Sequence, residues 1–429
     1  MIRSRTSGLL SRVFTLPRAF DRYRDYCRPG QYQAIRTRAH RLRGLRLVEI
    51  SSSPHAGEAA RQLHSFAPIL VGLGLDVRWY TMLDCLDFFT VAKKIENLLQ
   101  GDEGHLIAHE IDQFRRVSVD LTAEVGELDA DLLVVHDIPA IGVANRISPR
   151  PKAGLLWRSH LDLCHPNFSV LSFLQPFWRA YTAIVLQFPE YTVSGLARSR
   201  QRFVADAIDP LALRNQLIHR ETAREAMGRL GIDPSRPVVS FIGSLVANSD
   251  VLSIIQAFFL AREAVPGLQL ALLVTAAPYD DPTADTTARA VRTAVAGEAD
   301  IHLYSGPEEA RPLAIAAFQT ASDAVIVFSR HAGFGLDATE AMWKGNAVVA
   351  RDTGGLREQI TDGENGFLVG NIEQCAECLV RLVRDRALAE RLGQRAHQTV
   401  AERFLLPRLI DDCLTIYEEV STQLLGRVA

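Results

Sequence analysis

Hydrophobic and polar positions alternate along the chain in a regular order from residue 45 onward. Short apolar runs at 45–50 and 76–82 have the length of strands, and residues 60–75 between them carry apolar side chains at helical spacing. Further strand-like runs occupy 130–137, 154–163 and 183–189, and each ends at polar residues, glycine or proline. This alternation is typical of a parallel sheet with helices on both faces.

The same alternation starts again in the second half of the chain. A helical segment with flanking prolines over 209–237 is a predicted linker; strand-like runs follow at 238–245, 268–275, 299–306 and 322–329, with a helix over 251–267. We therefore predict an α/β protein with two facing, doubly wound, Rossmann-like parallel-sheet domains and an interdomain cleft for ligands. The predicted boundaries are an N-terminal arm over 1–44, a first domain over 45–215, a second domain over 216–395 and C-terminal helices over 396–429 that cross back to the first domain.

Length and composition indicate the class of protein but not its function. A chain of 429 residues exceeds what one core usually organises, and 48% hydrophobic with 23% charged residues is the balance of a soluble globular enzyme. The net charge of −3 gives no reason to expect nucleic acid as a partner. No run approaches the roughly 20 apolar residues that span a bilayer, so no transmembrane segment is expected.

The N-terminal arm is rich in arginine but lacks the continuous apolar core of a secretory leader. We favour a solvated arm that packs loosely on the first domain, and the alternative is peripheral contact with an anionic membrane surface.

The cysteines predict a reducing, cytoplasmic setting rather than a disulfide framework. Cys375 and Cys378 form a C-x-x-C within an amphipathic helical pattern, without the second pair that a zinc site would need. No metal or redox role is therefore expected. The six cysteines are Cys27, Cys85, Cys164, Cys375, Cys378 and Cys413.

Polar side chains gather at the ends of two strands in the first half. Arg158, His160 and Asp162 alternate along one predicted strand and would share a face. His136 and Asp137 end the preceding strand, at the same edge of the predicted sheet. These groups could bind sugar hydroxyls or phosphate, and the alternative is a hydrogen-bonded structural cluster.

A glycine-turned loop precedes a helix in the second half. Gly333 and Gly335 bracket Phe334, and the helix begins near Asp337. The free N–H groups and positive dipole end of a helix favour a phosphate there. Glu340 lies in the first turns of that helix, where it could accept hydrogen bonds from sugar hydroxyls or simply complement the dipole. A second turn, Thr353, Gly354 and Gly355, offers backbone N–H groups at the same edge.

Two segments, FGLDATEAMWKG from residue 334 and TGGLREQITDGENGFLV from residue 353, together resemble the retaining GT-B glycosyltransferases of family four. The segments HDIP, WRSHLDL, DFFTVAKKIENLLQG, FPEY and DDP narrow the resemblance to the branch similar to glycosyltransferring trehalose synthases, over roughly residues 20–405. The resemblance implies transfer of a hexose from a nucleotide diphosphate sugar to a sugar acceptor with the anomeric configuration retained. It implies no obligatory metal or other cofactor.

The first hypothesis for the site follows from this resemblance. His160 and Asp162 would act as catalytic residues that orient the sugars, and Arg158, His136, Asp137 and Gly57 would bind substrate. The donor-binding residues would be Gly333, Phe334, Gly335, Leu336, Glu340, Thr353, Gly354 and Gly355. The expected partners are small sugar molecules, and a homodimer is left open.

The chain departs from the family pattern where the donor binds. Glu340 matches the second of two glutamates that the family places eight positions apart, whereas Ala332 replaces the first. Ser244 and Ser249 stand where the family has an arginine and a lysine that clamp the diphosphate. Loss of one group that stabilises transition-state charge typically costs about 10²–10³ in rate.

Other residues bear on the same loss of positive charge. The family's run of glycines appears here as Ala56, Gly57 and Glu58, so a carboxylate could point toward an anionic donor. Arg330, Arg351 or Arg357 could replace the missing cations. The two alternatives are a catalytically impaired paralogue that binds a sugar or regulates an assembly, and a transferase or phosphorylase that uses a different activated-sugar donor.

Overall fold

The computed structural model describes residues 8–55, 57–83, 86–275, 277, 281–306 and 312–425. Cys85, Ala56 and part of the DDP segment lie outside these residues. The chain forms two compact units. The first contains Met1–Asp206, Pro278–Asp281 and Leu406–Ala429, and the second contains Ala207–Ala277 and Pro282–Leu405.

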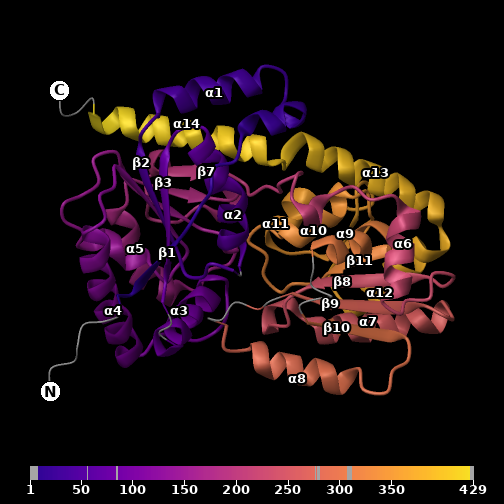
Figure 1. Ribbon diagram of the computed structural model, residues 1–429. Helices are drawn as coiled ribbons and strands as arrows, with labels where there is room; N and C mark the ends of the chain where they lie inside the picture. The colour runs from indigo at the N-terminus through magenta and orange to yellow at the C-terminus, as the bar shows by residue number, and fades with distance from the viewer. Residues whose placement is uncertain are drawn as a thin grey trace. The chain divides into compact units, whose positions relative to one another are not determined.

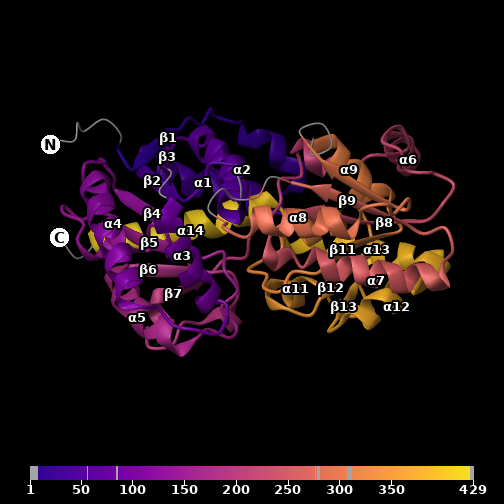
Figure 2. The same ribbon diagram turned by 90° about the horizontal axis from the view of Figure 1, so that it is seen from below.

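The first unit is built on a seven-stranded sheet in the order β1-β3-β2-β4-β5-β6-β7. Its strands are β1 Leu10–Val13, β2 Arg46–Ser51, β3 Asp76–Met82, β4 Leu132–His136, β5 Gly154–Arg158, β6 Ala183–Leu186 and β7 Gln201–Phe203. Figure 2 shows β4 to β7 following one another across the sheet. Only β1 is antiparallel to its neighbour, and the order reverses between β2 and β4, which makes the carboxyl ends of these strands the switch point where ligands bind in such sheets.

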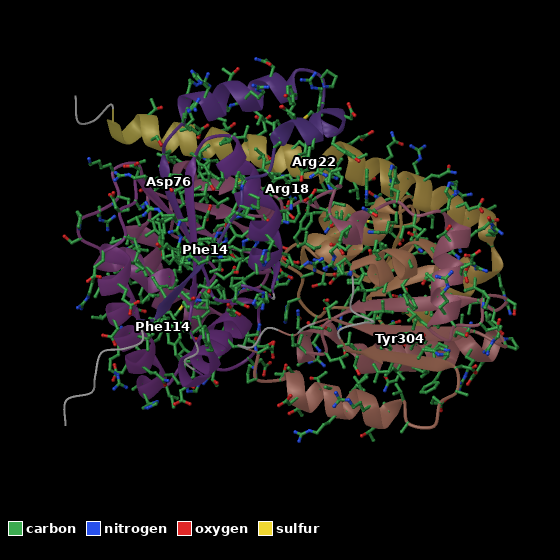
Figure 3. All side chains as sticks on the ribbon, in the orientation of Figure 1. Phe14, Arg18, Arg22, Asp76, Phe114 and Tyr304 are labelled. Atoms are coloured by element: carbon green, nitrogen blue, oxygen red, sulfur yellow. The ribbon has the colours of Figure 1, made fainter. Side chains whose placement is uncertain are left out.

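Helices flank this sheet because their apolar stripes need a partner surface. They are α1 Gln31–Arg41, α2 Glu58–Gly72, α3 Leu86–Leu99, α4 Ala108–Gly126, α5 Phe168–Ala180 and α14 Leu406–Leu425. Phe114 on α4, labelled in Figure 3, packs against Phe88 of α3 with ring centroids 5.5 Å apart and against Phe177 of α5 at 5.9 Å. These aromatic contacts tie the three helices into one layer.

The N-terminal arm is an integral part of the first unit. β1 adds an edge strand to the sheet, and α1 lies alongside α14 (Figure 1). Arg38 pairs with Asp411, and Arg41 donates to Glu418 at 2.9 Å. The expectation of a loosely packed arm was therefore wrong for the described part of the arm, because charged residues on α1 find acidic partners on α14.

The second unit has a six-stranded, all-parallel sheet in the order β10-β9-β8-β11-β12-β13. Its strands are β8 Val238–Gly243, β9 Gln269–Val274, β10 Ile301–Ser305, β11 Ala324–Val327, β12 Val348–Arg351 and β13 Phe367–Val369. The central strands are buried on both faces, as their continuous runs of valine, isoleucine and leucine predict. The order reverses between β8 and β11, so this unit has a switch point of its own.

The helices of the second unit cover both faces of its sheet. They are α6 Arg220–Arg229, α7 Val251–Ala264, α8 Ala284–Ala294, α9 Pro312–Ala321, α10 Leu336–Trp343, α11 Gly354–Gln359, α12 Ile372–Arg384 and α13 Arg386–Arg403. Tyr304 of β10, labelled in Figure 3, packs on Phe318 of α9 and donates its hydroxyl to the Leu230 carbonyl at 3.0 Å. The α6 segment, expected as a linker, is therefore part of this unit's packed structure.

Residues 207–215, which the sequence placed with the first domain, lie in the second unit. Ile208 N–H donates to the Phe404 carbonyl at 2.9 Å, and Trp343 Nε1 donates to the Asn215 carbonyl at 3.0 Å. These bonds also keep the end of α13 with the second unit, whereas α14 belongs to the first.

The C-x-x-C cysteines are buried, and none of the described helices could span a membrane. Cys375 and Cys378 are both buried residues of α12, and burial raises the pKa of Cys375 to about 12 and that of Cys378 to about 11, so their thiols stay protonated at neutral pH. No helix among the described residues is long and apolar enough to cross a membrane.

Candidate functional site

The Asp137 backbone is strained at the switch point of the first unit. Its φ is +53°, a left-handed conformation that few non-glycine residues adopt. Three bonds hold it there: its N–H donates to the Arg158 carbonyl at 2.9 Å, its carbonyl accepts from Trp157 Nε1 at 2.7 Å, and its Oδ1 accepts from His160 N–H at 2.7 Å. The residue as a whole is partly buried, and burial raises the pKa of its carboxyl group. Strain held in place by surrounding bonds is typical of a functional position.

A chain of buried hydrogen bonds lies behind Asp137. His160 Nδ1 is 2.7 Å from Asp206 Oδ2, and His160 Nε2 is 3.0 Å from His136 Nδ1. His136 Nε2 is 2.8 Å from Glu49 Oε2, and the Tyr417 hydroxyl donates to Glu49 Oε1 at 3.2 Å. Both ring nitrogens of His160 and of His136 are therefore bonded to protein groups, so neither ring offers a nitrogen to a ligand in this state.

Arg158 completes this buried network from β5. Its Nη2 donates to Asp206 Oδ1 at 2.7 Å, and its Nη1 donates to the sulfur of Cys413 at 3.3 Å. Gln187 Nε2 also donates to Asp206, at 2.9 Å, and Gln187 Oε1 accepts from the Asp206 N–H at 2.7 Å. Asp206 is thus the common acceptor of an arginine, a histidine and a glutamine, and Arg158 points into the protein rather than toward a substrate.

Electrostatics divide this network into charged and neutral groups. Burial would raise the pKa of Asp206, but the charges of His160 and Arg158 outweigh it and hold the pKa below its usual value. Burial would lower the pKa of His160, but the carboxylates of Asp206 and Asp137 outweigh it and raise the pKa. Burial, with the charges of His160 and Arg158, holds the pKa of His136 well below its ordinary value, so His136 is neutral.

Asp162 does not lie on a strand with Arg158 and His160, as the alternation predicted, because β5 ends at Arg158. Its Oδ1 accepts from the Cys164 N–H at 3.0 Å, which stabilises the turn that follows. Arg158 and His160 nevertheless converge, since both bind Asp206. Gly57, with φ of +89°, is exposed at the N-terminus of α2 near the same switch point.

One set of described residues has metal-like spacing. Glu58, His160 and Asp206 each offer a ligand atom, and these atoms lie within 4.8 Å of one another. Asp206 is already bound to the Arg158 guanidinium, however, so a divalent cation here would lie close to a fixed positive charge. The set fits a metal poorly, and we assign none to it.

The glycines of the second unit allow a loop and a helix to approach closely. Gly335 caps α10 with φ of +93°, and a Cβ on Gly355 would lie 2.4 Å from the Gly333 carbonyl oxygen. The Gly355 N–H donates to the Ala332 carbonyl at 2.7 Å. These contacts give the glycines a packing role. The Gly355 N–H, which the sequence assigned to phosphate, is bonded to the protein instead.

Other predicted donor-binding residues are also held by the protein. Phe334 is buried against Phe404, with ring centroids 5.3 Å apart, and Leu336 is buried as well. Thr353 Oγ1 donates to the Arg330 carbonyl at 3.0 Å, which ties the turn at Thr353 and Gly354 to the loop that follows β11. The side chains of Phe334 and Leu336 are therefore part of the core, so these two residues could reach a ligand only through their backbone groups.

Glu340 is buried on α10 and paired with an arginine that the sequence analysis missed. Arg214 donates from Nε to Glu340 Oε2 at 3.0 Å, and its Nη2 lies 2.8 Å from the same oxygen. Gln319 Nε2 also donates to this oxygen, at 3.4 Å. Arg214 was overlooked because it lies in the segment that the sequence assigned to the first domain.

Positive charge in the second unit comes from strand ends rather than from the Ser244 and Ser249 positions. Arg351, at the end of β12, donates from Nη1 to Asp250 Oδ2 at 2.9 Å, and Arg330, after β11, lies 3.6 Å from Asp250 Oδ1. Asp250 follows Ser249 directly and precedes α7 with φ of +47°. Two arginines and one carboxylate thus leave a net positive charge beside the switch point of this unit.

Known protein families match the two units of the chain separately. Residues 49–193 match the family model for the N-terminal domain of trehalose synthase, and residues 223–399 match the model for glycosyl transferases group 1. The chain is 32% identical over 418 residues to the trehalose synthase of Rubrobacter xylanophilus, covering 96% of this chain and 99% of that protein. It is 28% identical over 400 residues to the trehalose synthase of Pyrococcus horikoshii, covering 93% and 96%.

Solved structures with the same fold share little sequence. A sucrose-phosphate synthase from Thermosynechococcus elongatus superposes with a TM-score of 0.67 at 16% identity, covering 88% of this chain and 100% of that one. A UDP-forming α,α-trehalose-phosphate synthase from Burkholderia vietnamiensis gives a TM-score of 0.68 at 16% identity, covering 87% and 96%. These likenesses show the predicted GT-B fold. With the full-length relatives, they show that this chain belongs to the trehalose synthase family of glycosyltransferases.

Proposed function

We propose that the protein transfers a hexose from a nucleotide diphosphate sugar to a sugar acceptor, with retention of the anomeric configuration. The observation that carries the acceptor side is Asp137, whose strained backbone is held by three bonds at the switch point of the first unit. A carboxylate at the switch point accepts hydrogen bonds from sugar hydroxyls and orients the hydroxyl that attacks. The buried network behind it keeps the site rigid and polar.

The second unit supplies the groups that the donor needs. The N-terminus of α10 has the positive end of a helix dipole. Arg330 and Arg351 add the fixed positive charge that Ser244 and Ser249 do not carry. These cations would stabilise the diphosphate as it gains charge on leaving. Among the structural neighbours, Anabaena HepE was solved in complex with UDP and glucose, with a TM-score of 0.60 to this chain at 14% identity.

The test is turnover with UDP-, ADP- and GDP-glucose and glucose as acceptor, with the product's anomeric configuration read by NMR. An α-linked product from an α-linked donor supports retention, and an inverted product overturns it. Asp137→Asn should lower kcat by about 10²-fold or more, because the amide loses the charge but tolerates the left-handed backbone. The matched control is Asp129→Asn, an exposed carboxylate paired with Arg46 in the same unit. Equal rates for both variants would contradict the role of Asp137.

A second candidate function has its own observation. Ala332 removes one donor carboxylate, and Arg214 already occupies the Glu340 carboxylate. A chain that binds nucleotide or sugar in calorimetry but turns over no donor would fit a regulatory or assembly role. Turnover with sugar 1-phosphates alone would instead favour a changed donor.

A further inference from the structure

The buried path from Glu49 to Asp206 contains three hydrogen bonds between titratable side chains. Glu49, His136, His160 and Asp206 are joined in that order at 2.8, 3.0 and 2.7 Å, and each is at most 5% exposed. Burial shields these groups from direct exchange with bulk water. A proton at one end therefore has a continuous route to the other end through side chains.

The end of the path at Asp206 has a defined direction. Asp206 is an anion that Arg158 also binds, so His160 Nδ1 carries a proton and donates to it. Exchange is then confined to the other ring nitrogen. His160 Nε2 faces His136 Nδ1, and His136 Nε2 faces a carboxylate that either accepts or donates.

This geometry allows two complete arrangements of protons. In the first, His160 Nε2–H donates to His136 Nδ1, and His136 Nε2–H donates to the Glu49 carboxylate. In the second, each of these protons has crossed its hydrogen bond: Glu49 Oε2–H donates to His136 Nε2, and His136 Nδ1–H donates to His160 Nε2. The net change moves one proton from His160 to Glu49, so a buried cation and a buried anion both become neutral.

We infer that Glu49 is a proton reservoir for His160, and that His136 relays the proton between them. Two opposing effects act on the position of the proton. Burial raises the pKa of Glu49 to about 8 against the charge of Arg158 and the bond from Tyr417, which favours neutral Glu49. The carboxylates around His160 favour its charged form despite burial.

Other titratable groups surround the path on every packed element. Tyr417 and Cys413 come from α14, Arg158 from β5, and Glu58 from α2, while Arg408 of α14 donates to the Asp206 carbonyl. Arg158 and Asp206 form an ion pair in which the positive and negative charges offset each other. Burial raises the pKa of both Tyr417 and Cys413, so these two stay neutral at physiological pH. Glu49, His136 and His160 are therefore the groups that exchange the proton.

The relay reaches substrate through Asp137. The backbone N–H of His160 donates to Asp137 Oδ1, and the charge of the His160 ring opposes the rise that burial causes in the pKa of Asp137. When the proton passes to Glu49, that opposition is lost and Asp137 becomes a stronger base. His160, Glu49 and His136 thus act on the substrate only through the charge that they place next to Asp137. This effect on Asp137 rests on the proposed function, whereas the exchange of the proton between Glu49 and His160 does not.

The experiment follows the ring nitrogens by ¹⁵N NMR in the whole protein, without substrate. A proton that crosses the relay leaves His160 Nε2 and shifts the His136 proton from Nε2 to Nδ1, so the ¹⁵N shifts of both rings should lie between those of the two arrangements and give the same populations at each temperature. A His136 ring held in a single tautomer, or different populations from the two rings, would overturn the relay. This readout needs no activity, so its failure is distinguishable from failure of the transferase proposal.

Glu49→Gln sharpens the test because glutamine keeps the hydrogen bonds but cannot store the proton. We expect the pKa of His160 to fall by about one unit, since its negative partner is lost. The matched control Glu418→Gln alters an exposed carboxylate on α14 that pairs with Arg41, and it should leave the His160 titration unchanged. A His160 pKa that is the same in Glu49→Gln and wild type would contradict the proposal.

Discussion

The switch points of the two units hold charge in different ways. In the first unit, Glu49, His136, His160, Asp206 and Arg158 form one buried network. In the second unit, charged groups form separate pairs, Arg214 with Glu340 and two arginines with Asp250. A connected buried network resists single changes because each member depends on the others, whereas separate pairs can be exchanged one at a time.

The largest expected effect is on the network itself. Asp206→Asn should destabilise the protein by about 3–5 kcal/mol, because it leaves the Arg158 guanidinium buried without its anion. Urea unfolding followed by circular dichroism measures the loss. The control Asp129→Asn should stay within about 0.5 kcal/mol of wild type. A small effect of Asp206→Asn would contradict the view that the buried network of the first unit resists single changes more than the ion pairs of the second unit do.

The next effect depends on pH. The folded state keeps the Glu49 proton up to a pKa of about 8, whereas the unfolded chain releases it near 4.5. The contribution of Glu49 to stability is therefore full below about pH 4.5 and is lost as the pH rises through about 8. Over that interval Glu49→Gln should gain several kcal/mol relative to wild type, because each unit of pKa difference corresponds to about 1.4 kcal/mol. Parallel stability curves for the two proteins would contradict this sign.

A smaller effect is expected at the Arg214 pair in the second unit. Arg214→Ala leaves the buried Glu340 carboxylate without its cation, and it should cost about 2 kcal/mol. The double variant with Glu340→Gln should recover part of the loss, because no charge is then left buried. Full additivity of the two changes would show that the pair is not coupled.

The smallest stability effect is expected at the Asp250 cluster. Arg351→Ala should change the free energy of unfolding by less than about 1 kcal/mol, since the pair is partly exposed. It should nevertheless weaken nucleotide diphosphate binding by about tenfold, which calorimetry at low and high salt measures. Unchanged affinity would remove Arg351 from the donor site and would favour the impaired alternative.

The sequence predicted both sheets and several site positions from local patterns. His136, Asp137, His160 and Arg158 were identified because polar residues end apolar runs, and the structure places all four at one switch point. The binding role of Asp137 remains a prediction that the Asp137 variant tests, whereas the side chains of His136, His160 and Arg158 are bonded within the buried network.

The missed residues share a physical cause. Glu49 is a lone charge inside an apolar strand pattern, so periodicity counted it as part of a strand and nothing more. Asp206 and Tyr417 reach the network from 46 and 368 residues away along the chain, counted from His160 and Glu49 respectively. Such contacts depend on the topology of the whole unit, which local spacing does not contain. The boundary near Asn215 was misplaced for the same reason, since its partner is Trp343.

Helix α14 has a consequence for how the protein is made. The first unit begins at the N-terminus, yet α14 gives it Tyr417 and Cys413, and α1 takes its acidic partners from α14 as well. Chains emerge from the ribosome at about 5–20 residues per second, and domains usually fold in the order of synthesis. The first unit can therefore be completed only after the second unit has been translated, because its buried Glu49 carboxylate and its helix α1 have their partners on α14.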